Sequence, residues 1–256
     1  MKLSIITVNR NDAIGLEKTI QSVICQELAD YEYIVIDGNS TDNSVEIIKK
    51  YSEHIHYWIS EPDLGIYNAM NKAIKVASGE YLIFMNSADC FISSDTLLNV
   101  FSKEQTADLL VGSILKNWKR RKERKSPPAK ITFYNVRYCY PIPHQSTFIK
   151  KKLFDELGLY DESKLGADTK FAFLAIFKYD KSIENLNQDI ALMDVTGISN
   201  SSNGVSQMKK EMDDMIQEYF PYFYDDNKEL YQLKRFTIDR LRRHIKWRLR
   251  KLIYRQ

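Results

Sequence analysis

Three aspartates stand where carboxylates could do chemistry. Asp37 and Asp89 each follow an apolar run of strand length, and Asp168 comes shortly after a glycine, at the start of a predicted helix. At the carboxyl end of a strand in an open α/β sheet, a carboxylate can bind a base or ribose, or hold a divalent cation together with substrate phosphates. A carboxylate at a helix start can act as a general base. The pattern indicates a phosphorylated ligand with a proton acceptor beside it.

Each of these residues also fits a plainer role when it is taken alone. Asp37 could form a turn with the glycine after it, Asp89 could cap the next helix, and Asp168 could be the N-cap of its own helix. A lone histidine such as His144 is more often structural than catalytic. Spacing alone leaves both sets of roles open.

The elements that would position these residues alternate between strand and helix. Apolar runs of strand length predict strands, and periodic apolar residues predict amphipathic helices. The predicted strands are residues 3–8, 33–36, 56–59, 81–85, 109–113 and 190–195, with a further strand near 148–149; the predicted helices are 14–24, 42–51 (capped by Thr41), 66–77, 95–101, 151–157 and 168–177. Alternation of this kind predicts an α/β fold with a mostly parallel, Rossmann-like central sheet flanked by helices. Residues 116–130 are predicted to be a basic, proline-containing loop.

Composition excludes several classes of protein. No apolar run approaches the ~20 residues of a membrane span, and the early strand argues against a signal peptide. The three cysteines are far apart, which suits a reducing cytoplasm and argues against a disulfide framework or a zinc site. Neither a G-x-G-x-x-G motif after the first strand nor a P-loop is present, which counts against a classical dinucleotide or P-loop site.

The charge is unevenly distributed along the chain. Residues 234–256 contain ten of the 37 Lys and Arg but only one of the 34 Asp and Glu, so the rest, with 27 basic and 33 acidic residues, is acidic. This tail also carries an apolar helical stripe at Ile238, Leu241, Ile245, Leu249 and Leu252. A basic amphipathic helix is typical of binding to an anionic membrane surface. The alternatives are a helix packed on the body and a nucleic-acid partner, although nothing else here resembles a nucleic-acid module.

Several segments, in order, resemble family 2 glycosyltransferases of the GT-A fold over residues 2–205. The opening Leu-Ser-Ile-Ile-Thr-Val-Asn, the Glu-Tyr-Ile-Val-Ile-Asp segment at 32–37, and the Glu-Pro-Asp-Leu-Gly-Ile-Tyr-Asn-Ala-Met-Asn-Lys segment at 61–72 match motifs of that family. Asn-Ser-Ala-Asp at 86–89 resembles its "NSGD", and His-Gln-Ser at 144–146 its "HQS". The resemblance is to bacterial enzymes that build exopolysaccharide, O-antigen and capsule. It implies residues 1–205 as the catalytic domain and 206–256 as a helical C-terminal extension.

The resemblance also implies a role for individual residues. Asp89 would hold Mn²⁺ or Mg²⁺ on the diphosphate in the D-x-D position, and Asp168 would be the base that deprotonates the acceptor hydroxyl. The Gly197-Ile198-Ser199 segment resembles a closing loop near the acceptor. Substrate-binding positions would be Thr7, Asn9, Arg10, Asp37, Asp63, Lys72, Asn86, Ser87, His144 and Gln145.

The activity implied by the resemblance is that of a metal-dependent, inverting hexosyltransferase. Its donor would be a nucleoside-diphosphate sugar, with UDP favoured over GDP, and its acceptor a glycan or a polyprenyl-diphosphate-linked glycan. It would lie in the cytoplasm, on the inner face of the inner membrane. Some positions depart from the family pattern: Ser87 stands at the first carboxylate of D-x-D, Ala88 replaces glycine, Asn68 replaces aspartate, and Thr169 follows Asp168. These departures support an alternative, a non-catalytic binder of sugar nucleotides or glycans with a degenerate site.

Overall fold

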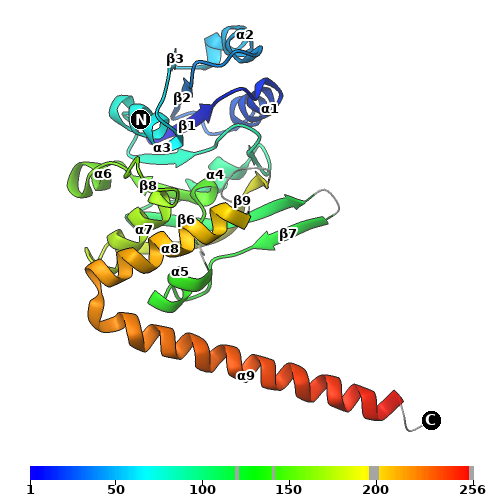
Figure 1. Cartoon of the computed structure of the whole chain (residues 1–256). Coiled ribbons are helices and arrows are strands. Elements are labelled where there is room, and N and C mark those ends of the chain that lie inside the picture. The colour runs from blue at the N-terminus through cyan, green and yellow to red at the C-terminus, as the bar shows by residue number, and fades with distance from the viewer. Residues whose placement is uncertain (119–120, 140–141, 196–201, 254–256) are drawn as a thin grey trace. The chain divides into compact units, whose positions relative to one another are not determined.

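The computed structural model describes residues 1–118, 121–139, 142–195 and 202–253 (Figure 1). The chain divides into two compact units, Met1–Lys209 and Lys210–Gln256. The first unit contains the sheet and every predicted site residue. The two units are described separately below.

The first half of the chain folds into parallel β-α-β units, as the sequence predicts. Strands β1 (Leu3–Asn9), β2 (Tyr31–Asp37), β3 (Tyr57–Ser60) and β4 (Tyr81–Phe84) lie in the order β3-β2-β1-β4, all parallel. The connections contain α1 (Ala13–Ile24), α2 (Ser44–Lys50) with the short 3₁₀ helix η1 (Ser52–His54), and α3 (Ile66–Val76). Asn9 pairs with Asp37, and Asp37 pairs with Ser60, so the carboxyl ends of three neighbouring strands are level.

The second half of the sheet mixes parallel and antiparallel strands. Strand β8 (Thr147–Lys150) runs antiparallel between β4 and β6 (Leu109–Trp118), while β9 (Ile183–Asp194) runs parallel to β6 and pairs at its end with the short β5 (Cys90–Phe91). The helices here are α4 (Thr96–Val100), α5 (Phe133–Cys139), η2 (His144–Ser146), α6 (Lys152–Leu157) and α7 (Ala167–Phe177). The expected α/β fold with a mostly parallel sheet flanked by helices is confirmed.

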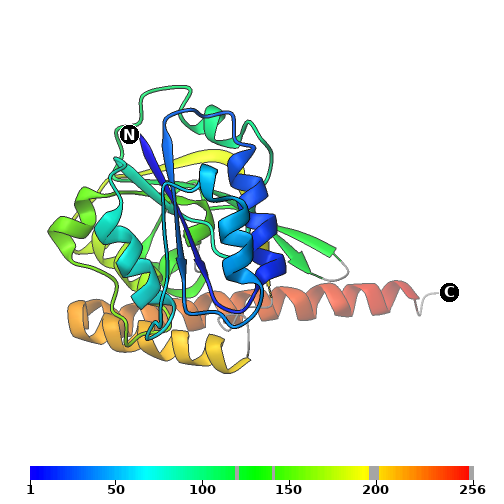
Figure 2. The same ribbon diagram turned by 90° about the horizontal axis from the view of Figure 1, so that it is seen from above.

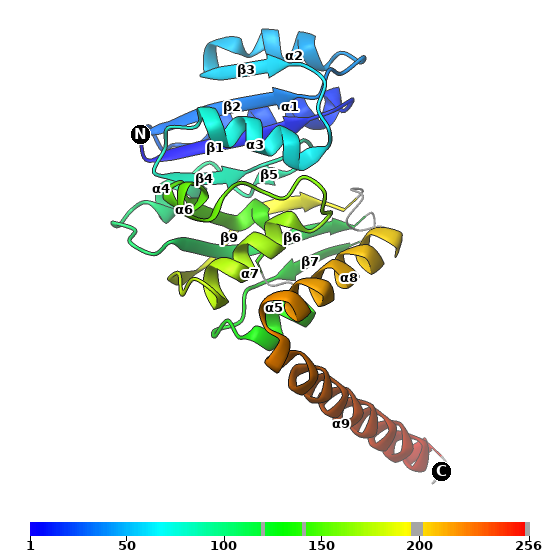
Figure 3. The same ribbon diagram turned by 60° about the vertical axis from the view of Figure 1, so that its left-hand side comes forward.

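Helices cover both faces of the parallel strands. Figures 2 and 3 show α1 and α2 on one face and α3 on the other. Helix α1 buries Leu16, Ile20 and Val23, which follow the three-to-four-residue spacing of an amphipathic helix, in one core with strand residues such as Ile5 and Ile83. Burial on both faces explains why these strands are continuous apolar runs rather than alternating ones.

Three predictions of local structure are wrong. Residues 116–130 do not form one loop: β6 continues to Trp118 and pairs with β7 (Arg121–Lys125) as an antiparallel hairpin. Strand β9 begins at Ile183 rather than at residue 190. Thr41 does not cap α2, because that helix begins at Ser44 with Asn43 as its N-cap.

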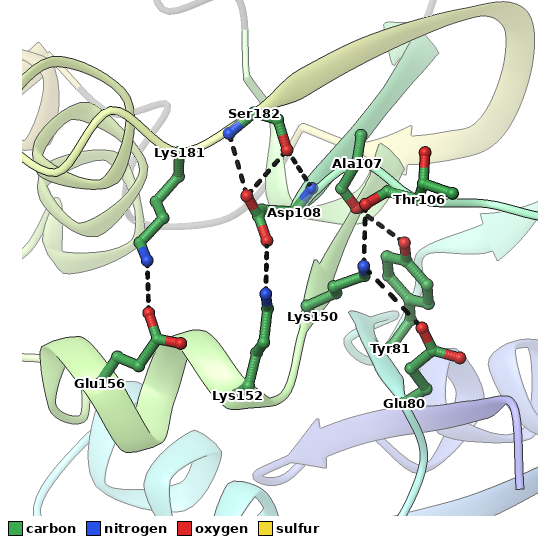
Figure 4. A network of polar contacts seen from close by, with 10 residues as sticks. All are labelled: Glu80, Tyr81, Thr106, Ala107, Asp108, Lys150, Lys152, Glu156, Lys181 and Ser182. Atoms are coloured by element: carbon green, nitrogen blue, oxygen red, sulfur yellow. Dashed lines mark hydrogen bonds and ion pairs between the residues drawn. The ribbon is translucent and has the colours of Figure 1, made fainter.

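A polar network anchors the sheet near the start of β4 (Figure 4). The Asp108 carboxylate accepts hydrogen bonds from the Ser182 amide at 3.0 Å and hydroxyl at 2.7 Å, and pairs with Lys152 at 3.1 Å. Lys150 donates to the carbonyl oxygen of Thr106 at 2.8 Å. These contacts join the end of β8 and the start of α6 to the starts of β6 and β9. They fix the strands whose far ends carry the candidate site.

The second unit contains the end of α8 (Ser202–Tyr219) and all of α9 (Pro221–Ile253), a helix of 33 residues. The helical C-terminal extension is therefore present, and its predicted boundary at residues 205–206 stays a prediction. Among the described helices, none is both long enough and apolar enough to cross a membrane.

Candidate functional site

A polar network joins the carboxyl ends of β1, β2 and β4. Asn9 Nδ2 donates to Asp37 Oδ1 at 2.7 Å, and the Ser87 hydroxyl donates to Asn9 Oδ1 at 2.7 Å. The buried Asp37 carboxylate also accepts from the hydroxyls of Ser40 at 2.6 Å and Ser60 at 2.7 Å. Three predicted site residues, Asn9, Asp37 and Ser87, are thus in direct contact. The turn proposed for Asp37 forms as well, because the Ser40 amide donates to Asp37 Oδ2 at 2.9 Å.

Arg10 and Asp63 lie together beside this network. Their closest charged atoms, Arg10 Nη1 and Asp63 Oδ1, are 3.8 Å apart, and the Asp63 side chain is only 6% exposed. A Cβ atom added to Gly38 would lie 2.2 Å from Asp63 Oδ2 and 3.4 Å from Arg10 Cδ. Gly38 therefore allows the close approach of these two predicted site residues to the end of β2.

Two side chains of α3 hold neighbouring loops. Lys72 Nζ donates to the Pro62 carbonyl oxygen at 2.9 Å and pairs with Glu61 at 2.7 Å. Asn68, which stands where the family motif has aspartate, donates to Glu162 Oε2 at 2.9 Å. In this structure Lys72 therefore supports the loop that carries Asp63, and its predicted contact with the donor stays a prediction.

Thr7 lies below the edge of the sheet rather than on it. Its side chain is fully buried, and its hydroxyl bonds to the Met85 carbonyl oxygen at 2.7 Å and to the Tyr33 hydroxyl at 2.9 Å. The predicted contact of Thr7 with a nucleotide stays a prediction, and in this structure the Thr7 side chain is fully buried. Thr7 instead links β1 to the end of β4.

Asp89 is a buried carboxylate with partners on each oxygen. Gln145 Nε2 donates to Asp89 Oδ2 at 3.1 Å, and the Asp194 amide donates to Asp89 Oδ1 at 2.8 Å. Burial raises the pKa of Asp89 to about 6, although the charge of His144 and these hydrogen bonds oppose the rise. Asp89 does not cap α4, whose N-cap is Asp95.

The oxygens of the Asp89 carboxylate are suited to a cation that is held mainly by a bound ligand. Each carboxylate oxygen has two lone pairs, so one remains on each Asp89 oxygen beyond the hydrogen bonds above. Within the described ranges no group of three or more His, Cys, Asp or Glu could hold a metal ion by itself. Mg²⁺ keeps several waters and commonly binds through one or two carboxylates plus substrate phosphates. Asp89 therefore suits a cation that arrives with a diphosphate.

The turn that carries Asp89 has a strained residue. Ala88 has a φ of 71°, a left-handed conformation that favours glycine. This explains why the resembling motif has glycine there. Space is also short, since a Cβ added to Gly15 of α1 would lie 2.9 Å from the Ala88 Cβ. Close packing of α1 on the turn sustains the conformation.

His144 and Asp168 form a hydrogen-bonded pair on η2 and α7. His144 Nδ1 lies 2.9 Å from Asp168 Oδ2, and the Tyr67 hydroxyl lies 2.7 Å from Asp168 Oδ1. His144 Nε2 lies 3.2 Å from Asn86 Nδ2. The His144 and Asp168 side chains are 19% and 15% exposed, so both are largely buried. Asp168 is not the N-cap of α7, because Gly166 holds that position.

The two members of this pair shift each other's pKa. Burial alone raises the pKa of Asp168, but the hydrogen bond and charge of His144, with the Tyr67 hydrogen bond, hold that pKa below its ordinary value. Burial alone lowers the pKa of His144, but the Asp168 hydrogen bond and charge, and the charge of Asp89, raise it above its ordinary value. The pair therefore favours a charged histidine beside a charged aspartate.

Sequence reasoning did not predict the contacts made by Tyr67, Ser40 and Ser60. Tyr67 lies inside the segment at 61–72 that carried the resemblance, so its motif could have found it. Ser40 lies three residues after β2, in the turn that follows Asp37, and Ser60 is the last residue of β3. The Gly197-Ile198-Ser199 segment lies outside the described residues.

Comparison with known proteins identifies a family and several relatives of this chain. The model of the family "Glycosyl transferase family 2" matches residues 4–158. An uncharacterised glycosyltransferase of Mycobacterium tuberculosis is 33% identical over 189 residues, which are 68% of this chain and 68% of that protein. A poly(ribitol-phosphate) beta-glucosyltransferase of Bacillus spizizenii is 34% identical over 122 residues, 44% of this chain but only 19% of that protein.

A solved structure with the same fold is S. aureus TarS 1–349 in complex with UDP-GlcNAc. Its TM-score is 0.65 at 18% identity, over 88% of this chain and 73% of that one. At this identity the likeness shows the fold, and it confirms the expected GT-A architecture. Because the family model covers more than half of the residues and ends beyond the Asp89 turn, the chain belongs to glycosyl transferase family 2.

Proposed function

We propose that this transferase is an inverting enzyme that moves a hexose from a nucleoside-diphosphate sugar to an acceptor hydroxyl. One observation carries the proposal: consecutive residues bind the two carboxylates that the reaction needs. His144 contacts Asp168, and Gln145 donates to Asp89. The diphosphate side and the proton-accepting side of the reaction therefore meet on one short helix, η2.

The donor lies along the carboxyl ends of β1, β2 and β4. Asn9, Asp37, Arg10 and Asp63 line the nucleotide, with UDP favoured over GDP, while Asn86 and Ser87 lie beside the diphosphate. Asp89 holds Mn²⁺ or Mg²⁺, which when bound offsets the charge that develops on the leaving diphosphate. Since Asp89 must be ionised to bind a cation, the donor site weakens as the pH falls through about 6.

The acceptor reacts on the opposite side of the sugar. Its oxygen attacks the anomeric carbon from the face opposite the diphosphate, the bond to the diphosphate breaks, and the acceptor proton leaves to the His144–Asp168 pair. Asp168 supplies the carboxylate of this base. A positioned base contributes roughly 10²–10⁴-fold to such a step.

The acceptor is a glycan or a polyprenyl-diphosphate-linked glycan used in bacterial surface polysaccharide synthesis, such as O-antigen or capsule. The name of the Bacillus relative, a transferase acting on poly(ribitol-phosphate), supports a cell-surface polymer. The basic tail, residues 234–256, binds the cytoplasmic face of the inner membrane rather than nucleic acid. A sedimentation assay tests whether the tail binds an anionic membrane. We expect the protein to sediment with phosphatidylglycerol vesicles but not with phosphatidylcholine vesicles.

The alternative is a binder of sugar nucleotides that has lost catalysis. The serine at position 87, where D-x-D has a carboxylate, is its main support. The two hypotheses differ in turnover: both predict nucleotide binding, but only the enzyme transfers sugar.

The deciding experiment is transfer from labelled UDP- and GDP-sugars to bacterial membranes with Mn²⁺ present. We expect transfer from at least one UDP-sugar and a loss of roughly 10²–10⁴-fold in Asp168→Asn. Asp95→Asn, an exposed carboxylate at α4, serves as the control and should retain activity. Nucleotide binding without transfer from any donor would favour the non-catalytic alternative.

A further inference from the structure

Helix α3 holds the segment that leads to Asp168 through a series of side-chain contacts. Asn71 is buried; its Nδ2 donates to the Tyr160 carbonyl oxygen at 2.9 Å, and its Oδ1 accepts from the Tyr160 amide at 3.0 Å. At the start of the helix, the Tyr67 hydroxyl bonds to the Leu165 carbonyl oxygen at 2.9 Å and to Asp168 Oδ1 at 2.7 Å. As the segment runs from residue 160 to residue 168, its contacts therefore move towards the start of α3.

Glu162 binds α3 between these two points. Its Oε1 accepts from Asn71 Nδ2 at 2.9 Å, and its Oε2 accepts from Asn68 Nδ2 at 2.9 Å. The hydrogen bonds from Asn71 and Asn68 lower the pKa of Glu162, although burial opposes them, and the charges of Lys75 and Lys72 act in the same direction as the hydrogen bonds. Glu162 is therefore a carboxylate at neutral pH, and each of its oxygens is bound by an amide donor of α3.

The amide of Asn68 is matched to Glu162 in its polarity. Asn68 Oδ1 accepts from the Leu64 amide at 3.3 Å while Nδ2 donates to Glu162, so both ends of the amide face a suitable partner. Aspartate, which the family motif has at this position, would have no hydrogen to donate and would face Glu162 with a like charge. The departure from the motif at position 68 is thus complemented by the residue at position 162.

We propose that Asn68 and Glu162 together are positioning residues, which hold the segment before Asp168 in place on α3. The inference rests on the proposed transfer reaction, in which Asp168 supplies the carboxylate of the base. Helix α3 begins directly after the loop that carries Asp63, and Asn68 also binds this loop through the Leu64 amide. One helix therefore sets the spacing between the donor loop and the base.

A displacement of Glu162 would be transmitted to Asp168 through the helix that follows. Asp161, the residue before Glu162, pairs with Lys170 of α7 at 3.2 Å, and Asp168 lies in the first turn of the same helix. A shift of about 1 Å in the position of a catalytic group can cost about 10²-fold in rate. Because Glu162 is exposed and Tyr67 still holds Asp168, we expect a smaller loss, of about tenfold.

The first test is amide hydrogen exchange of residues 160–168 in the full, ligand-free chain. Asn68→Asp should accelerate exchange in this segment by about tenfold, because Glu162 loses a donor and gains a like charge. Adding Glu162→Gln should return the rates to within about twofold of wild type, since the new glutamine can donate to the new aspartate and still accept from Asn71. Glu53→Gln, at an exposed carboxylate of η1, is the control. Unchanged exchange in Asn68→Asp, or faster exchange that Glu162→Gln does not reverse, would overturn the proposal.

The second test is the kinetics of transfer from UDP-sugars to bacterial membranes. Asn68→Asp should lower kcat by about tenfold, and the double variant with Glu162→Gln should recover to within about threefold of wild type. UDP binding and the KM for the donor should stay within about twofold in both, because the new aspartate still accepts from the Leu64 amide. An active wild type whose kcat Asn68→Asp leaves unchanged would refute the positioning role alone. An inactive wild type would refute the transfer reaction and the positioning role with it, whereas the contact measured by exchange would stand.

Discussion

Replacement of Asp89 by asparagine should stabilise the ligand-free protein. The carboxylate is 4% exposed, and burial raises its pKa to about 6. Each pKa unit corresponds to about 1.4 kcal/mol, so a rise from about 3.9 costs the folded state roughly 3 kcal/mol at neutral pH. Asparagine has nearly the same shape and no charge. Its oxygen can accept from the Asp194 amide, and Gln145 can turn its amide to present oxygen to the new Nδ2.

The stability gained by Asp89→Asn should increase as the pH rises. Folded Asp89 binds its proton more tightly than the unfolded chain does, so wild-type stability falls as the pH rises from about 4 to about 6. Asparagine does not titrate. The difference between the variants should therefore be near zero at about pH 4 and reach its full value above about pH 6.5, where we expect roughly 1–3 kcal/mol after strain in the new contacts.

Urea unfolding between pH 4.5 and 8, with a chelator present, measures this difference. For a protein of this size, each kcal/mol of added stability raises the melting temperature by about 2–4 °C. The melting temperature of Asp89→Asn should therefore be several degrees above that of wild type. Asp95→Asn is a matched control that should not stabilise the protein at neutral pH, because hydrogen bonds from Ser93 and Asn99 lower the pKa of Asp95. If Asp89→Asn destabilises the protein equally at every pH, the buried-charge argument is wrong.

Three further substitutions test other parts of the site. Ala88→Gly should raise the stability by about 0.5–1 kcal/mol in thermal unfolding, because it relieves a φ of 71°; a lower stability would mean that the Ala88 side chain packs favourably. Gly38→Ala should weaken UDP binding in calorimetry by about tenfold or more, since the new Cβ would lie 2.2 Å from Asp63 Oδ2, and unchanged affinity would remove Asp63 from the site. Tyr67→Phe should lower kcat by about tenfold with little change in KM, as expected for a lost hydrogen bond to a charged group; an unchanged kcat would show that Asp168 needs no second partner.

The parallel half of the fold was predictable because its strands are buried on both faces. Residues such as Ile34 and Ile83 belong to short apolar runs that end in polar turns, and each run became a strand close to its predicted bounds. The start of β9 was missed because it is a mixed polar segment with Asn187 at a φ of 52°, which interrupts strand periodicity. The hairpin of β6 and β7 was missed because its charge resembles that of a solvated loop, while its pairing depends on register rather than on composition.

The candidate site was predictable in its residue types but not in its partnerships. Asp89 and Asp168 were identified from strand ends and motif position. Their partners come from distant segments: Tyr67 is 101 residues from Asp168, and Gln145 is 56 residues from Asp89. Packing of η2 against β4, β6 and β9 brings Gln145 to Asp89, and Tyr67 on α3 meets Asp168 on α7. Sequence spacing contains no direct measure of such contacts.

The most direct test of the donor site is calorimetry of UDP with and without Mn²⁺, for wild type and Asp89→Ala. The account predicts that wild type binds UDP at least about tenfold more tightly when Mn²⁺ is present. It also predicts that Asp89→Ala removes the effect of Mn²⁺ while it keeps a folded structure. Equal metal dependence in the two proteins, or no binding of UDP by either, would contradict a donor site organised around Asp89.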